Sequence, residues 1–145
     1  MSAPLPQYFY NPFTNNFDLA GLGTASGSTP FPAGVQGWTN VTGVTQQLAL
    51  NMGYTADNPS TQIVFTLPVT CVYGSFFRVA GIAAGLWKIV QNAGQTIHFG
   101  IDDTTTGVTG YLASTLRYDT VSLLCISANT DFLVLDGPQG NLIFN

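Results

Sequence analysis

Short apolar segments separated by turn residues dominate the sequence from Trp38 onward. Apolar and polar residues alternate within many of these segments, and Gly, Pro, Asn and Asp stand between them. Alternation with a period of two is typical of strands that bury one face. We therefore expect strands at residues 44–51, 62–67, 76–82, 86–91, 95–99, 120–128, 131–136 and 140–144.

This spacing of strands and turns predicts an all-β fold, either an antiparallel β-sandwich or a jelly-roll-like barrel, formed by residues 38–145. The shortage of the charged residues that long helices expose supports this. Every acidic residue is Asp, the chain has no Glu, and Lys88, Arg78 and Arg117 are its only basic residues. Long helices expose Glu, Lys and Arg, so we expect no substantial helix.

The clearest local prediction is a hairpin across Asn92-Ala93-Gly94, with Gly94 at the position that needs a left-handed backbone. Side chains alternate along each strand, so the paired positions would share one buried face. Lys88 and His98 would lie on the other, partly wet face. The expected pairs are Gln91 with Gln95, Ile89 with Ile97, and Trp87 with Phe99, and the hairpin core is Trp87, Ile89, Ile97 and Phe99.

Residues 1–37 lack this strand pattern and are predicted to form an extended N-terminal arm and linker ahead of a self-association domain at 38–145. Asn-Pro and Asn-Asn pairs favour turns in the arm, and residues 24–37 are rich in Thr, Ser, Gly and Pro. Aromatic rings crowded into the arm must dock, either on the chain's own domain or on a neighbouring subunit. These candidate docking residues are Tyr8, Phe9, Tyr10, Phe13 and Phe17.

Composition points to association with other chains. Only 7% of the 145 residues are charged, against about a quarter in average soluble domains, and 46% are hydrophobic. Such a chain either buries apolar surface against partners or coats it with neutral polar residues. The length suits one domain with appendages.

Charge and hydropathy exclude several partners. The net charge is −4, and three scattered basic residues cannot make a face that binds phosphates, so we expect no nucleic-acid partner. No apolar run approaches the roughly 20 residues of a membrane span, and the first residues lack the pattern of a signal peptide. We expect a protein that is made in a cytoplasm and does not contact membranes.

Candidate chemistry is sparse. His98 is the only histidine, and no nucleophile signature surrounds it or the neighbouring Asp102 and Asp103. Cys71 and Cys125 have no zinc-ligand spacing, and they are read either as two buried thiols or as a disulfide. We predict no catalytic, cofactor-binding or metal-binding residues, and therefore no enzyme.

Several segments taken together resemble a β-domain that recurs in bacteriophage tail fibres, tailspikes and capsid decoration proteins. The most specific is GLWKIVQNAGQTIHFG at residues 85–100, although this chain has Gly85-Leu86-Trp87 where the family pattern runs Gly-Gly-Trp. The resemblance covers about residues 46–144. The other matching segments are YTADN at 54–58, FTLP at 65–68, TTTGVTGYLAST at 104–115, DTVSLLC at 119–125, ANTDFLV at 128–134 and QGNLIF at 139–144.

The resemblance implies a virion structural protein that forms homotrimers. Two functions are compatible with it. The first is a capsid decoration, or cement, protein on the outer surface of the particle, whose aromatic arm grips other virion proteins, above all the major capsid protein. The alternative is a tail-fibre, tailspike or adaptor protein that takes part in binding a carbohydrate receptor of the host.

Overall fold

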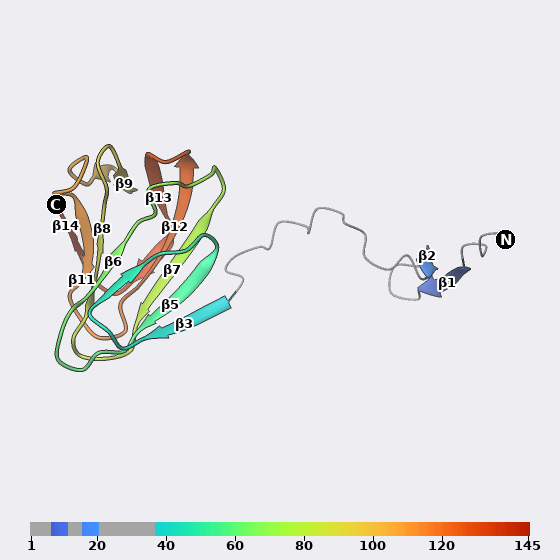
Figure 1. Cartoon of the computed structure of the whole chain (residues 1–145), viewed down its shortest axis with the longest axis horizontal. Coiled ribbons are helices and arrows are strands. Elements are labelled where there is room, and N and C mark those ends of the chain that lie inside the picture. The colour runs from blue at the N-terminus through green and yellow to red at the C-terminus, as the bar shows by residue number, and fades with distance from the viewer. Residues whose placement is uncertain (1–6, 12–15, 21–36) are drawn as a thin grey trace. The chain divides into compact units, whose positions relative to one another are not determined.

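The computed structural model of the chain describes residues 7–11, 16–20 and 37–145 (Figure 1). It divides into two compact units, Met1–Phe31 and Pro32–Asn145. In the first unit, β1 (Gln7–Asn11) and β2 (Asn16–Ala20) pair as an antiparallel hairpin. Asn11 and Asn16, the described residues of the Asn-Pro and Asn-Asn pairs predicted to turn, end β1 and begin β2. Of the candidate docking residues, Phe13 and the side chains of Tyr8, Phe9, Tyr10 and Phe17 lie outside the described residues.

The second unit is all-β, as predicted, and its described residues contain no helix, so none that could cross a membrane. It consists of two open sheets rather than a closed barrel. The seven-stranded sheet has the order β10 (Asp102–Asp103), β9 (Thr96–Phe99), β13 (Asp131–Gln139), β12 (Thr120–Ser127), β7 (Phe76–Gly81), β5 (Met52–Ala56), β3 (Gly37–Val41). The five-stranded sheet has the order β14 (Leu142–Phe144), β11 (Tyr111–Ser114), β8 (Trp87–Val90), β6 (Ile63–Thr66), β4 (Thr45–Gln47).

The prediction of antiparallel pairing is wrong for much of this unit. From β3 to β9 the chain changes sheet after every strand, so β3, β5 and β7 run parallel in one sheet and β4, β6 and β8 run parallel in the other. Strands β9 and β13 are also parallel. Each connection crosses from one sheet to the other, and two crossings return the chain in its original direction. The alternation of apolar and polar residues shows only which side chains point inward. It is the same in parallel and in antiparallel strands, so it does not predict how the strands pair.

The predicted hairpin across Asn92-Ala93-Gly94 is wrong for the same reason. Strand β8 pairs with β6 and β11, whereas β9 pairs with β10 and β13 in the opposite sheet. Gly94 does adopt a left-handed backbone, with φ of 76°. Because both strands face the same core, Trp87, Ile89 and Ile97 are fully buried despite the different pairing. Phe99 is only partly buried, and its ring centroid lies 5.8 Å from that of Phe144.

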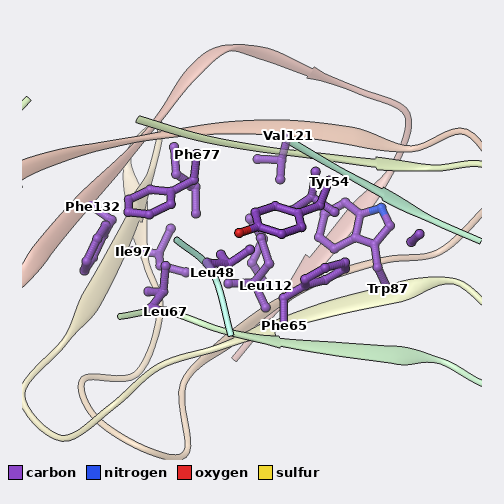
Figure 2. Close-up of a cluster of buried hydrophobic side chains, with 14 of the residues drawn as sticks. Leu48, Tyr54, Phe65, Leu67, Phe77, Trp87, Ile97, Leu112, Val121 and Phe132 are labelled. Atoms are coloured by element: carbon purple, nitrogen blue, oxygen red, sulfur yellow. The ribbon is translucent and has the colours of Figure 1, made fainter. Parts of the chain in front are cut away.

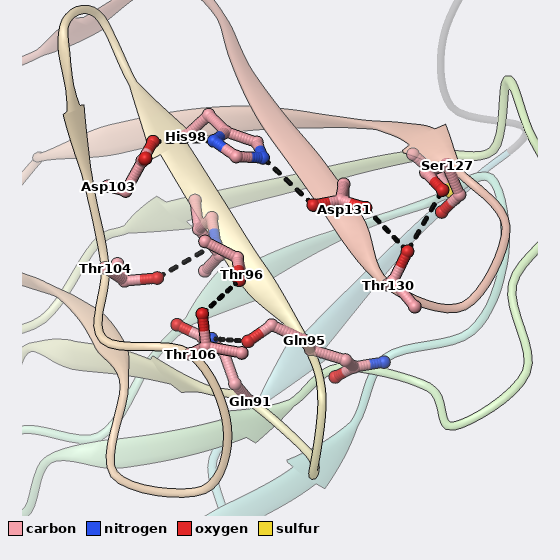
Figure 3. A network of polar contacts seen from close by, with 12 residues as sticks. Gln91, Gln95, Thr96, His98, Asp103, Thr104, Thr106, Ser127, Thr130 and Asp131 are labelled. Carbon is pink, nitrogen blue, oxygen red and sulfur yellow. Dashed lines mark hydrogen bonds and ion pairs between the residues drawn. The ribbon is translucent and has the colours of Figure 1, made fainter.

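Two glutamines hold this crossing between the sheets instead of facing each other across a hairpin (Figure 3). The Gln91 amide donates to the carbonyl of Gln95. The Gln95 amide donates to the carbonyls of Pro68 and Asn129 at 2.8 and 3.1 Å, and its oxygen accepts from the Asn92 N–H at 2.8 Å. Both side chains are buried, so their amide groups need partners within the protein, and these bonds provide them.

One hydrophobic core fills the space between the sheets (Figure 2). Trp87, Phe65 and Leu112 come from the five-stranded sheet, and the seven-stranded sheet contributes facing aromatic and branched side chains. Tyr54 meets Phe65 across the interface with ring centroids 5.7 Å apart, and its hydroxyl bonds the Ala49 N–H at 2.7 Å. The residues that the seven-stranded sheet contributes include Tyr54, Phe77, Val79, Ile97, Val121, Leu123 and Phe132.

Trp87 is tied to the turn before β12 by its indole. The indole N–H donates to the Asp119 carbonyl at 2.9 Å, and the Trp87 N–H donates to the Ser114 hydroxyl at 2.9 Å. The buried Asp119 carboxylate accepts the N–H groups of Thr115 and Leu116 at 2.8 and 2.9 Å. The same Asp119 carbonyl accepts from the Gly81 N–H at 3.0 Å, so one turn fastens β7, β8 and β11 together.

Both cysteines are buried free thiols, which is one of the two readings that the sequence left open. Burial raises the pKa of Cys71 to about 12, and the neighbouring Cys125 adds to the rise. Thiolate, the reactive form, is therefore scarce at neutral pH.

We predict that Asp119→Ala lowers the free energy of unfolding by about 3 kcal/mol, because it removes the buried carboxylate that accepts the N–H groups of Thr115 and Leu116 and closes the turn. Urea denaturation followed by circular dichroism measures the change. Asp102→Ala, on the exposed edge strand, is the matched control and should cost less than about 0.5 kcal/mol. Equal losses in the two variants would contradict the structural role of Asp119.

Candidate functional site

A groove of about 290 Å³ crosses the outer face of the seven-stranded sheet. It lies over a row of paired, outward-facing positions in which Trp38 is opposite Gly53, Gly53 opposite Arg78, Arg78 opposite Ser122, and Ser122 opposite Leu135. Trp38 forms one wall and residues of β13 form the other. We call it the Trp38 groove.

The Trp38 wall depends on a glycine. A Cβ atom at Gly53 would lie 2.6–2.8 Å from three carbons of the indole, so the ring rests directly on the sheet where Gly53 has no side chain. Trp38 is still 50% exposed, because it lies on the edge strand β3. One face of the ring is therefore fixed and much of the remaining surface is open to solvent.

The opposite wall is a bulge in β13. Ser122 of β12 pairs with Leu135, but Thr120 pairs with Gln139, so Val121 faces three residues instead of one. The extra residues include Asp136, whose φ is 58°, and Pro138, which has no N–H to give to a ladder. Bulges of this kind re-aim side chains and often border functional sites.

The floor combines small side chains with one fixed cation. Arg78 donates from Nε to the Ser122 hydroxyl at 2.9 Å, and its Nη2 lies 3.8 Å from an Asp136 oxygen. Ala80 and Thr120 occupy the next row of the floor. The groove therefore offers an aromatic surface, hydrogen-bond donors from Arg78 and acceptors from Asp136, with no net charge.

A second polar cluster surrounds His98 on the same sheet (Figure 3). The ring atoms Nδ1 and Nε2 lie 2.6 Å from Asp103 and 3.1 Å from Asp131. The hydrogen bond with Asp103 is the main cause that raises the pKa of His98, Asp131 adds to it, and partial burial opposes it. The pKa of Asp131 is lowered, chiefly by the hydroxyl of Thr130 at 2.6 Å.

This arrangement does not assemble a catalytic centre. Both nitrogens of His98 are engaged by carboxylates, so neither faces a hydroxyl or thiol that it could activate. Within residues 37–145, no three His, Cys, Asp or Glu side chains converge in a way that could hold a metal ion. The cluster instead joins β10 to β9 and β13.

The sequence prediction missed the Trp38 groove. Trp38 was identified only as the start of the strand-rich region, and β3 was not predicted. The predicted strands at 131–136 and 140–144 leave residues 137–139 between them, whereas residues 136–138 form a bulge within β13. A Gly-Pro pair beside a predicted strand is the one signal that could have indicated the bulge.

Comparison with known proteins gives no family for this chain. No protein-family model matches it, and a search of curated proteins found no match. The resemblance to bacteriophage virion domains therefore stays a prediction.

We predict that His98 stabilises the fold in acid and loses this effect in mild alkali. Its pKa is raised on folding, so its contribution is complete below the unfolded value of about 6.5 and disappears as the pH rises through the higher folded value. The destabilisation caused by His98→Gln should therefore be larger at about pH 5.5 than at about pH 9. Urea denaturation of both proteins at each pH measures it. A pH-independent difference would contradict this assignment.

Proposed function

We propose that this chain is a non-catalytic structural protein of a bacteriophage virion, a capsid decoration protein that forms homotrimers. The observation that carries the proposal is the unequal distribution of charge between the two sheets. The strands of the five-stranded sheet contain one charged residue, Lys88. The strands of the seven-stranded sheet contain Arg78 and four aspartates, as well as His98.

The outer face of the five-stranded sheet is suited to contact with further copies of the chain. Its one cation is masked, because the Lys88 ammonium lies 3.7 Å from the centroid of the Tyr111 ring. Around this pair are partly exposed apolar side chains, of which Ile143 is 49% exposed. The partly exposed apolar residues of this face are Val64, Val90, Tyr111 and Ile143, and Ala113 on the same face is buried.

A face of this kind favours self-association. Copies of one chain bring identical charges together in a symmetric assembly, and a face with a single masked charge avoids this repulsion. The low charge of the whole chain agrees with the burial of surface against partners. The parallel pairs depart from the antiparallel Greek keys of a jelly roll, so the proposal uses only a two-sheet sandwich as its self-association domain.

We propose that the N-terminal unit attaches the protein to the virion. Its predicted docking aromatics would attach the trimer to other virion proteins, above all the major capsid protein, on the outer surface of the particle. Aromatic anchors commonly dominate such interfaces.

The alternative is a tail-fibre, tailspike or adaptor protein that binds a carbohydrate receptor. The Trp38 groove favours this alternative, because an exposed indole beside Arg78 and Asp136 is suited to a ligand with both apolar and hydroxylated surfaces.

We predict a trimer at micromolar concentration in light scattering of the full chain. Val90→Asp places a charge on the proposed interface and should shift the protein to monomer. Val69→Asp, at a 70% exposed loop position, is the matched control and should remain trimeric. A monomeric wild-type protein, or a trimer unaffected by Val90→Asp, would contradict the proposed interface.

Copy number on the particle separates the two functions. A decoration protein that covers the capsid lattice is present in roughly hundreds of copies, whereas a fibre tip is present in roughly tens. Quantitative mass spectrometry of purified virions measures this ratio against the major capsid protein. We expect the higher number, and the lower number would favour the tail location.

A further inference from the structure

We propose that the Trp38 groove is a binding site for a neutral pyranose sugar, one ring of a host or environmental glycan. The inference rests on the alternative function given above, the binding of a carbohydrate, and deepens it by naming the site and the kind of sugar. It is separate from self-association, because the groove and the proposed trimer face belong to different sheets.

The two sides of the groove match the two kinds of surface that a pyranose presents. A sugar ring has a face of C–H groups, which pack on an aromatic ring, and a rim of hydroxyls, which both donate and accept hydrogen bonds. Trp38 supplies the aromatic surface at one wall. Arg78 supplies planar donors and Asp136 supplies acceptors across the floor from it.

The groove is formed before any ligand arrives. The absence of a side chain at Gly53 lets the indole lie on the sheet, the Ser122 hydroxyl holds the Arg78 side chain, and the β13 bulge sets the backbone of Asp136. A preformed site loses little side-chain entropy on binding, which matters for a ligand as small and polar as one sugar. The bulge also keeps Asp136 in a left-handed backbone, a conformation that non-glycine residues adopt only when the surroundings impose it.

Charge selects among the possible ligands. Arg78 is the one cation in the groove and Asp136 lies 3.8 Å from it, so a phosphate or a carboxylate would meet a carboxylate as well as the guanidinium. A purely apolar ligand would leave both charged groups and the Ser122 hydroxyl without water. A neutral ligand rich in hydroxyls avoids both costs.

Size limits the ligand further. A volume of about 290 Å³ lies at the lower end of the range of small-molecule sites, which suits a single ring with its neighbours outside the groove. We therefore expect weak, millimolar binding of individual sugars. Several copies of the site in an assembly would raise the avidity for a glycan surface.

The test uses the full chain with ¹⁵N-labelled tryptophan and neutral methyl pyranosides as probes: methyl glucoside, galactoside, mannoside, fucoside, rhamnoside and N-acetylglucosaminide. Trp38 and Trp87 are the two tryptophans, so the spectrum holds two indole N–H signals. We expect at least one probe to shift the Trp38 signal in a saturable way and to leave the Trp87 signal, which comes from the core, unchanged. The corresponding acidic probe, methyl glucuronoside, should bind more weakly.

Variants give the decisive comparison. Trp38→Ala should weaken the affinity at least about tenfold, read from shifts of the groove's backbone signals in uniformly ¹⁵N-labelled protein. Gly53→Ala should also weaken it, because the added Cβ displaces the indole. Gly43→Ala, where an added Cβ meets nothing within 4 Å, should bind as wild type. The unchanged Trp87 signal shows that each variant is folded.

The proposal is overturned if no neutral probe shifts the Trp38 signal, if Trp38→Ala and wild type bind equally, or if the acidic probe binds best. Light scattering on the same samples measures the oligomeric state, so that failure of sugar binding can be distinguished from failure of the proposed assembly. A protein that forms the trimer but binds no sugar would contradict the sugar site and leave the proposed assembly standing. A monomer that still binds sugar would contradict the assembly and leave the sugar site standing.

Discussion

Burial of the Trp87 indole between two sheets is the constraint on which most of this structure depends. The ring must be covered on both sides, and its N–H must find an acceptor where water is absent. Asp119 provides that acceptor from a turn that its own carboxylate closes. A Cβ at Gly140 would overlap the same carboxylate, so the turn before β14 is also shaped around Asp119. One aromatic side chain thus sets the positions of strands from both sheets.

The sequence predicted the class of fold and much of the inward-facing set, but not the pairing. Alternation identified Trp87, Ile89 and Ile97 as core positions because only one face of each strand is buried. It could not show that β8 and β9 lie in different sheets, since an arch between sheets and a hairpin within one sheet give the same inward pattern. Gln91 and Gln95 serve backbone carbonyls at this arch, which no local pattern indicates.

The sequence pattern did not predict the candidate site, and the reason is related. Trp38, Gly53, Arg78 and Ser122 come from four different strands and meet only through the lateral register of the seven-stranded sheet. That register follows from the parallel pairing of β3, β5 and β7 and from the antiparallel pairing of β7 with β12, which the sequence did not reveal. His98 was identified as the only histidine, but its two carboxylate neighbours depend on the pairing of β9 with both β10 and β13.

The alternation of the chain between sheets has a consequence for how the protein is made. Strands β3 and β4 begin the two sheets, and β5 to β8 can then add in order as they leave the ribosome, since each of these four lies beside a strand already formed. Strand β7, however, lies between β5 and β12, and β12 is synthesised only after β8, β9, β10 and β11. During that interval the β7 edge has free N–H and C=O groups beside an unfinished core. Late closure of long-range pairs is slow and leaves edges open to other chains. The stage before Thr120–Ser127 emerges is therefore the one at which a nascent chain is most exposed to misassembly.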